Sequence, residues 1–339
     1  MWKIAAGFFA GLVLLTPAAN AQVTRQEVIA FESATMMPVE NFLTGKNGTL
    51  VTLAGYLRLP KNNEKNPVLV LFHGANGLGG DGSPVYDWSR ILNEAGIATF
   101  AVDSFSGRGI ATLADASKID PVSRVVDAYR ALDLLAKHPL VDASKIAVMG
   151  FSHGGGAALY SSLVRFQQMY GKPEVQFAAH VSVYGGCHTT FRQDEALTNR
   201  PVLMLHGTAD DWVAIGPCRE YVARLIKASM NARLIEYPEA YHAFDAPGVR
   251  EAIKLPQALT RRKCRFAEVE DGSLVNADTK QPFSLSDPCF ERGTTVQYNE
   301  AAANKAHDDV KAFLKEVFAQ KKPSLLLVVV ARICVAAWA

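Results

Sequence analysis

The feature that most constrains the fold lies at residues 145–160, where an apolar run passes through a glycine-flanked serine into a stretch of small residues. Residues 145–149 have the composition of a short buried strand, and the residues from Ala157 onward favour a helix. Between them stands the pattern G-x-S-x-G, with Ser152 at its centre. A sharp turn between strand and helix requires glycines there, because larger residues leave no room for it. The segment therefore predicts a strand, a strained turn at Ser152 and a helix.

The rest of the chain alternates strand-like apolar runs with helical patterns. The runs are residues 50–59, 67–72, 96–102, 177–184, 202–205 and 233–237, and the helical patterns follow Pro121 and cover 219–228 and 310–318. Such alternation predicts an α/β fold with a mostly parallel central sheet and helices on both faces. We expect residues 233–237 to form the last strand.

The chain has 339 residues, of which 49% are hydrophobic, enough for one large core. We expect residues 22–322 to form a single domain. Residues 245–298 fit it poorly, being rich in proline, glycine and charge, and we interpret them as a disulfide-stapled insertion. It either shapes the mouth of the active site or packs on the surface. The tail, residues 323–339, is almost wholly apolar, and its role stays open.

The N-terminus has the pattern of a signal peptide at residues 1–21. Lys3 provides the positive charge, residues 4–15 are apolar, and Ala19-Asn20-Ala21 is a cleavage site. The apolar run is too short for a membrane span, which needs about 20 residues. We therefore expect export to the periplasm or the medium, a mature chain beginning near Gln22, and no stable membrane span.

Export makes disulfides the expected state of the five cysteines. They are Cys187, Cys218, Cys264, Cys289 and Cys334. Sequence proximity favours the pairs Cys187–Cys218 and Cys264–Cys289 and leaves Cys334 in the tail unpaired, although the sequence alone does not exclude other pairings. No spacing typical of a metal site occurs, so we expect no metal and no cofactor.

Ser152 is the expected nucleophile, because the turn lifts its hydroxyl to the N-terminus of the next helix, where developing negative charge is favoured. A serine needs a base, and the base needs an acid to orient it. In this type of fold the acid and then the histidine follow the serine. Asp210, in the turn after strand 202–205, is the expected acid, and His242, after strand 233–237, the expected base. Asp211 is the alternative acid or a helix cap.

The oxyanion of the tetrahedral intermediate needs backbone N–H donors. One is expected from His153, directly after the nucleophile, and the other from Ala75, in the glycine-rich loop after strand 67–72. A phosphate-binding role for this loop lacks the G-K-[ST] that would support it. Of the other histidines, His307 is expected on the exposed side of the last helix.

Five motifs together resemble the dienelactone hydrolase family, in particular its exported branch. They are HGANG at 73–77, VDSF at 102–105 with Arg108 and Gly109, GFSHGG at 150–155, GTADDWV at 207–213 and YHAF at 241–244. The resemblance implies the α/β-hydrolase fold, ester or lactone hydrolysis, and a disulfide between Cys187 and Cys218. The family prototype has a cysteine in place of Ser152 and a glutamate in place of Gly74, which favours esters over the namesake lactone. Asp103 and Arg108 are expected to form an ion pair under the site, with contact to the substrate as the alternative.

Two readings of function remain open from the sequence. The first is a metal-independent serine esterase with a small-molecule substrate, and the second is a catalytically idle hydrolase fold used as a binding module. A small peptidase is the next alternative among enzymes, although peptidases of this kind normally bring a large extra domain. The net charge of +2 argues against nucleic acid as a partner.

Overall fold

The computed structural model describes residues 25–46, 48–79 and 83–320. The predicted signal peptide at 1–21 and the apolar tail at 323–339, with Cys334, lie outside the described residues. Within those residues, no helix combines the length and the apolar character that a bilayer crossing needs.

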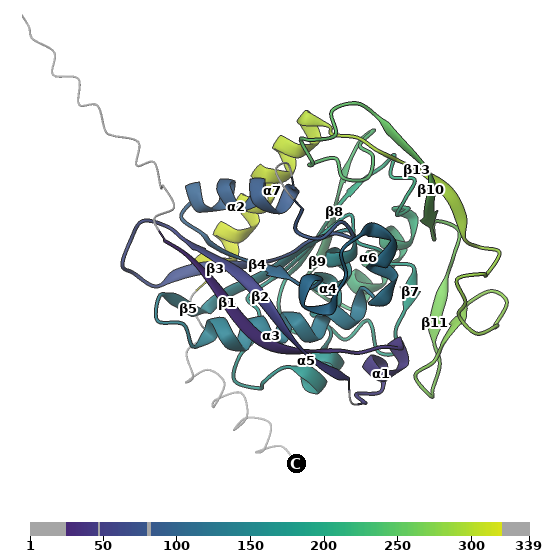
Figure 1. The fold of residues 1–339 in the computed structure, drawn as a ribbon, viewed down its shortest axis with the longest axis horizontal. Coiled ribbons are helices and arrows are strands. Elements are labelled where there is room, and N and C mark those ends of the chain that lie inside the picture. Colours follow the sequence, from purple (N-terminus) through teal and green to yellow (C-terminus); the bar gives the residue numbers. More distant parts are fainter. Residues whose placement is uncertain (1–24, 47, 80–82, 321–339) are drawn as a thin grey trace, which may run out of the picture.

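A central eight-stranded sheet has the order β1-β2-β4-β3-β5-β6-β8-β9 (Figure 1). Its strands are β1 (Arg25–Thr35), β2 (Thr49–Leu59), β3 (Asn66–Phe72), β4 (Ala98–Asp103), β5 (Val141–Phe151), β6 (His180–Val183), β8 (Val202–Gly207) and β9 (Ala232–Tyr237). β1, β2 and β4 pair antiparallel, whereas all neighbours from β4 to β9 are parallel. The predicted fold class, a mostly parallel α/β sheet, is confirmed.

Helices cover both faces of this sheet. They are α1 (Val39–Leu43), α2 (Pro84–Glu94), α3 (Val125–Ala136), α4 (His153–Tyr160), α5 (Val164–Tyr170), α6 (Gly216–Lys227) and α7 (Glu300–Ala319), with short 3-10 turns at Ser106–Arg108, Leu113–Lys118 and Val122–Arg124. α2 and α7 pack on one face, and α3, α4 and α6 on the other. Because every parallel strand ends at the same edge, the loops that follow β3, β5, β8 and β9 meet there.

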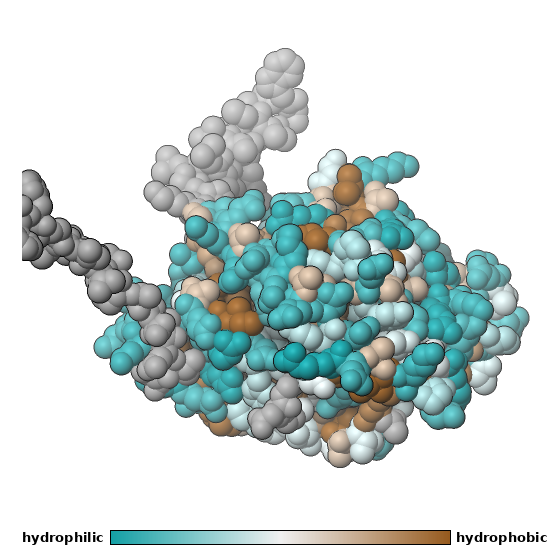
Figure 2. All heavy atoms as spheres, turned by 90° about the horizontal axis from the view of Figure 1, so that it is seen from above, coloured by the Kyte–Doolittle hydropathy of each residue, from teal (hydrophilic) through white to brown (hydrophobic). Residues whose placement is uncertain are grey.

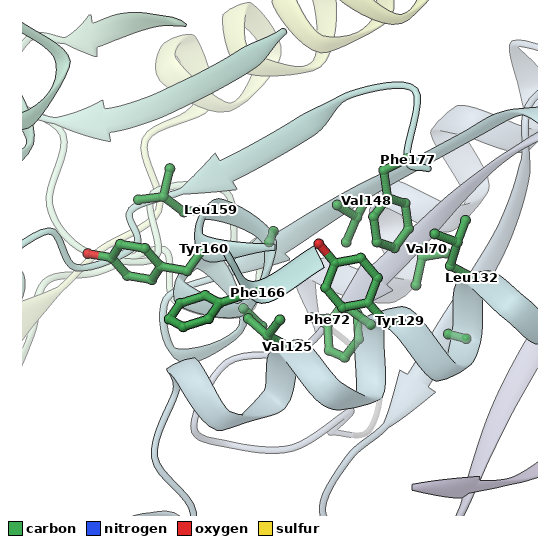
Figure 3. Close-up of a cluster of buried hydrophobic side chains, with 14 of the residues drawn as sticks. Val70, Phe72, Val125, Tyr129, Leu132, Val148, Leu159, Tyr160, Phe166 and Phe177 are labelled. Carbon is green, nitrogen blue, oxygen red and sulfur yellow. The ribbon is translucent and has the colours of Figure 1, made fainter. Parts of the chain in front are cut away.

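The core lies on both sides of the sheet because the side chains of each strand alternate between its faces. In β3, Val70 and Phe72 belong to the cluster beneath α3, where they join Tyr129 (Figure 3). Leu69 and Leu71 belong to the cluster beneath α2 and α7. All four strand residues are fully buried, and each such side chain contributes about 1.5–3 kcal/mol. This two-sided core makes the edge at which the loops meet a rigid platform.

Four further strands follow β9, so the prediction that residues 233–237 form the last strand is wrong. They are β10 (Ile253–Thr260), β11 (Phe266–Glu268), β12 (Leu274–Asn276) and β13 (Glu291–Val296). β10 pairs with β13 through an irregular register, and β11 lies between β12 and β7 (Thr189–Thr190). These strands form separate small sheets in which few positions are buried, so their sequences lack the apolar run of a central strand.

The surface is mixed in character. Figure 2 shows a face covered mainly by hydrophilic residues, with separate apolar patches between them. Among the described residues, the two most exposed large hydrophobic side chains are Leu50 (78%) and Val28 (64%), on strands β2 and β1. Singly scattered apolar residues are normal on a folded domain.

Candidate active site

A strained turn at Ser152 joins β5 to α4. Ser152 has φ 50° and ψ −111°, a conformation that costs about 1–3 kcal/mol in a non-glycine residue. The flanking glycines permit the turn: a Cβ on Gly150 would lie 2.0 Å from the carbonyl oxygen of Gly154, and one on Gly154 would lie 2.4 Å from that of Phe72. The helix begins directly after the serine, four residues earlier than expected, so its N-terminus adjoins the hydroxyl.

His242 lies between Ser152 and Asp210. Its Nε2 is 2.9 Å from Oγ of Ser152, and its Nδ1 is 2.7 Å from Oδ2 of Asp210. When Nδ1–H donates to the carboxylate, the lone pair on Nε2 faces the serine hydroxyl. The structure thus brings the three predicted residues into one hydrogen-bonded chain, an arrangement that can draw the proton from a serine hydroxyl.

The two neighbouring aspartates in the loop after β8 have different partners. Asp210 is buried, and its Oδ1 accepts hydrogen bonds from the backbone N–H groups of Trp212 and Val213 at 2.9 and 2.8 Å. Asp211 instead accepts from the backbone N–H and the hydroxyl of Thr295, at 2.7 and 2.9 Å. The alternative role of Asp211 as a helix cap is therefore wrong, because its carboxylate is bonded to β13.

The surroundings of Asp210 lower the pKa of its carboxyl group. Burial raises the pKa of this carboxyl, but His242 and hydrogen bonds from His206 and His242 outweigh burial and hold the pKa well below its usual value. A carboxyl of this kind stabilises the folded state above its unfolded pKa of about 3.9. That contribution is lost as the pH falls through the lower folded value.

We therefore expect the free energy of unfolding of Asp210→Asn to fall below that of the wild type by more at pH 6 than at pH 2. The difference should narrow by on the order of 2 kcal/mol over this range. Urea unfolding at a series of pH values measures it. Asp211→Asn is the matched control, because Asp211 bonds to Thr295 and to no histidine. A gap for Asp210→Asn that stays constant with pH contradicts the expectation.

Aromatic rings enclose His242, and the sequence analysis did not single them out as part of the site. The ring of Tyr184 lies edge-on at 4.8 Å, and that of Trp212 lies at 5.2 Å. The hydroxyl of Tyr184 donates to the buried carboxyl of Asp245 at 2.6 Å, and Nε1 of Trp88 donates to the same group at 2.7 Å. Burial raises the pKa of Asp245. The two rings limit the tilt of the imidazole, and the hydrogen bond to Asp245 holds the ring of Tyr184 in place.

The glycine-rich loop after β3 lies beside the serine. A Cβ on Gly74 would be 3.6 Å from that of Ser152. The carbonyl oxygen of Gly74 accepts hydrogen bonds from Nδ1 of His73 at 2.7 Å and from the backbone N–H of Gly77 at 3.3 Å. In a trans peptide the N–H points opposite to the C=O, so the N–H of Ala75 points away from these donors. Within the described residues, the N–H groups of Ala75 and His153 have no acceptor in the protein.

The expected ion pair between Asp103 and Arg108 is absent among the described residues. Arg108 pairs with Asp127 at 2.8 Å, in the interior. Oδ1 of Asp103 accepts from the backbone N–H groups of Phe105 and Ser106 at 3.0 and 2.9 Å. The nearness of the two residues in one motif suggested the pair. The carboxylate of Asp103 instead accepts hydrogen bonds from its own loop, and Arg108 pairs with Asp127 in α3.

The expected exposed position of His307 is also wrong. Its ring packs edge-on against Trp88, with the ring centroids 4.5 Å apart. Partial burial, ahead of the charge of Lys311, lowers the pKa of His307. The position lies at the border of the buried stripe of α7, where helical periodicity alone does not distinguish an exposed side from a covered one.

Two disulfides cross-link the described part of the chain. Cys187, after β6, is bonded to Cys218 in α6, and Cys264 is bonded to Cys289 within the segment that carries β10 to β13. The first bond ties the loop that follows β6 to the first turn of α6. The second closes the segment that the sequence analysis interpreted as a stapled insertion.

The segment between β9 and α7, which carries β10 to β13, contacts the loop that carries Asp210, rather than packing elsewhere on the surface. Nε1 of Trp212 donates to the carbonyl oxygen of Leu259 at 3.1 Å, and the Thr260 hydroxyl donates to the carbonyl oxygen of Trp212 at 2.6 Å. β13 reaches the histidine itself, because Val296 forms a β-bridge with His242. Of the two alternatives that the sequence left open, these contacts favour the one in which the segment shapes the site.

The donor set does not suggest a metal. Within the described ranges, no group of three or more histidine, cysteine, aspartate or glutamate side chains is placed to hold an ion. The chemistry that the arrangement offers is that of the serine, the imidazole and the backbone N–H groups.

Comparisons with known proteins indicate the family and the fold. The sequence profile of the dienelactone hydrolase family matches residues 53–318. Among solved structures, a dienelactone hydrolase-like promiscuous phosphotriesterase from metagenomic libraries superposes with a TM-score of 0.57 at 18% identity. The match covers 86% of this chain and 98% of that one. At this identity the likeness shows the α/β-hydrolase fold.

Two curated relatives are similar over part of their length. Acylamino-acid-releasing enzyme 1 of Oryza sativa subsp. japonica is 26% identical over 156 residues, 36% of this chain and 20% of the relative. Inactive dipeptidyl peptidase 10 of Rattus norvegicus is 25% identical over 185 residues, 47% of this chain and 23% of the relative. The chain therefore spans less than a quarter of the length of these relatives.

Proposed function

The chain belongs to the dienelactone hydrolase family and is a hydrolase that acts on ester bonds, and we propose that it is a serine esterase with Ser152 as its nucleophile. The substrate is a small carboxylic ester or lactone. His242 acts as the base and Asp210 as the acid that orients it. The single observation that carries the proposal is the hydrogen-bonded chain from Oγ of Ser152 at 2.9 Å to His242 and from there at 2.7 Å to Asp210.

Hydrolysis proceeds through an acyl-enzyme. Oγ of Ser152 attacks the ester carbonyl while Nε2 of His242 takes the hydroxyl proton, and Asp210 stabilises the imidazolium that forms. The N–H groups of Ala75 and His153 bind the oxyanion. The intermediate then collapses, the C–O bond to the alcohol breaks, and His242 gives its proton to the leaving oxygen. A water molecule, deprotonated by His242, hydrolyses the acyl-enzyme and regenerates the serine.

A fluorophosphonate probe tests the nucleophile. The purified wild type should be labelled in a 1:1 ratio, and mass spectrometry of a digest should place the label on the peptide that contains Ser152. p-Nitrophenyl esters of graded acyl length, with simple lactones beside them, then define the substrate class. A folded wild type that neither reacts with the probe nor turns over any ester contradicts the proposal and favours an idle binding module.

One comparison favours a second candidate, the cleavage of amide bonds. The rice relative is named as an acylamino-acid-releasing enzyme. The esterase panel therefore includes the p-nitroanilide of N-acetylalanine beside its p-nitrophenyl ester. We expect the ester to be hydrolysed and the anilide to be left nearly intact, and efficient release of p-nitroaniline reverses that assignment.

We also propose that the protein is exported, with residues 1–21 removed and 22–322 forming one catalytic domain. Support comes from the two disulfides, which persist in oxidising compartments, and from the charged, apolar and small-residue regions of the N-terminal sequence. The digest used for the probe also reports the N-terminal peptide. It should begin at Gln22, and a peptide that retains residues 1–21 contradicts the cleavage.

A further inference from the structure

A buried arginine lies at the start of α3, beneath the proposed oxyanion hole. Arg124 is fully buried, and its Nε and Nη2 have no hydrogen-bond partner among the described residues. The rings of Phe72 and Phe105 lie 5.4 and 5.3 Å from its guanidinium carbon and restrain its plane. A buried charge without a bonded carboxylate costs stability. Proteins accept such departures mainly at functional sites.

One nitrogen of Arg124 connects the two segments that carry the proposed oxyanion donors. Nη1 is 2.9 Å from the carbonyl oxygen of His73 and 3.0 Å from Nδ1 of His153. His73 opens the loop that leads to Ala75, and His153 follows the nucleophile. Because a single group bonds both segments, it fixes the position of one relative to the other.

The hydrogen bonds assign a neutral tautomer to each imidazole. An arginine only donates, so Nδ1 of His153 accepts, and its Nε2–H donates to the carbonyl oxygen of Ile119 at 3.2 Å. In His73, Nε2 accepts from the backbone N–H of Ser104 at 3.2 Å, so Nδ1–H donates to the carbonyl oxygen of Gly74. Burial, followed by the charge of Arg124, holds the pKa of both histidines well below its usual value.

The consequence for the loop follows from peptide geometry. The Nδ1–H of His73 and the N–H of Gly77 hold the Gly74 carbonyl, which turns the N–H of Ala75 the opposite way. Arg124 holds the preceding carbonyl, that of His73. The peptide that carries the first donor is therefore oriented from two consecutive carbonyl groups, before any substrate arrives.

We propose that Arg124 is a positioning residue of the oxyanion hole, which clamps the His73–Ala75 loop against His153 so that both backbone N–H groups converge on one oxygen. The inference rests on the proposed function. Among the described residues, Arg124 is fully buried and has no hydrogen bond to Ser152, Asp210 or His242. It preorganises the donors, and preorganised donors stabilise charge that develops only in the transition state.

Kinetics of Arg124→Met and Arg124→Lys test the clamp. We expect Arg124→Met to lower kcat about 10- to 100-fold, somewhat less than the loss of a whole donor, with KM within about threefold of the wild type. Arg124→Lys should recover part of kcat, because one ammonium can still donate to one of the two acceptors. The midpoint of the pH profile should not move, since the bonds of His242 are untouched.

The inhibition constant of a trifluoromethyl ketone provides a further measurement, which would not change if Arg124 had a merely structural role. The adduct of this ketone with the serine carries a negative oxygen, so its inhibition constant should weaken in parallel with kcat/KM across the variants. Arg165→Met is the matched control. Arg165 is also largely buried and bonds a backbone carbonyl and Glu268, but neither oxyanion segment. Loss of Arg165 should change the melting temperature and leave kcat and the inhibition constant near those of the wild type.

A second pair of variants covers the case in which Arg124→Met does not fold. His153→Leu removes the acceptor for Arg124 and the donor for Ile119, and His153→Gln keeps both. The clamp predicts that kcat falls further in His153→Leu than in His153→Gln. Both keep the backbone N–H. Folded Arg124→Met or His153→Leu with wild-type kcat overturns the clamp. Failure of the proposed function gives a different result: the wild type is then inactive, or its activity does not depend on Ser152.

Discussion

Replacing Ser152 by alanine is expected to lower kcat/KM for ester hydrolysis by about 10⁴- to 10⁶-fold and to abolish labelling by a fluorophosphonate. The reason is the order of the hydrogen bonds that link Ser152, His242 and Asp210. Oγ of Ser152 lies 2.9 Å from Nε2 of His242, and no other hydroxyl of the described residues bonds to this nitrogen and could give its proton to the base. The residual rate comes from the oxyanion donors and from substrate binding, which the substitution leaves in place.

Stopped-flow or steady-state assays with a p-nitrophenyl ester measure this loss, and circular dichroism checks the fold. Ser161→Ala is the matched control. Ser161 is a buried serine at the other end of α4 whose hydroxyl contacts the carbonyl oxygen of Ala158 and the side chain of His180. This variant should keep nearly full activity. Substantial turnover by folded Ser152→Ala means that another group is the nucleophile, and the assignment of the triad then fails.

Replacing Gly150 by alanine is expected to have the largest effect on stability, a loss of about 3–5 kcal/mol in the free energy of unfolding. The new Cβ would lie 2.0 Å from the carbonyl oxygen of Gly154 and 2.3 Å from its carbonyl carbon. Both are backbone atoms of the turn, so no side chain can rotate to make room. The strand and the helix must separate, which also moves Ser152 away from His242.

Urea unfolding compares Gly150→Ala with Gly216→Ala as its control. Gly216, at the start of α6, has no atom within 4 Å of a new Cβ. Alanine there should be neutral or stabilise by up to about 1 kcal/mol, through the lower entropy of the unfolded chain. If the two alanine variants unfold at the same urea concentration, the turn is not as tightly packed as the geometry indicates.

Local signals account for the parts of the fold that could be predicted. The apolar runs of β3, β5 and β8 and the helical spacing of α3 follow from side-chain periodicity, which acts within a few residues. The G-x-S-x-G turn is partly local, because Gly150 faces the backbone of Gly154 four positions later, whereas Gly154 faces the carbonyl oxygen of Phe72 at the end of β3. The order of serine, acid and histidine along the chain then narrowed the candidate site to a few residues.

The missed features depend on contacts between distant segments. The strands from β10 to β13 pair with one another and with β7, and their sequences carry no central-sheet pattern. Arg108 bonds Asp127 rather than Asp103, because α3 brings that carboxylate to it. Nothing in the local sequence of Arg124 indicates that it lies between His73 and His153. Each of these outcomes is decided by which surfaces the sheet brings together.

The sequence by itself determined the α/β class, the family and the position of the strained serine, because these depend on periodicity, spacing and the size of adjacent residues. Only the tertiary structure decided which aspartate faces the imidazole. Asp210 and Asp211 are adjacent and chemically identical, so local patterns rank them weakly. In the parallel sheet, β5, β8 and β9 end at one edge, and there Asp210 accepts a hydrogen bond from His242. Asp211 instead accepts one from Thr295 in β13. The physical reason is packing: neighbours in the chain point to different partners once the surrounding strands are in place.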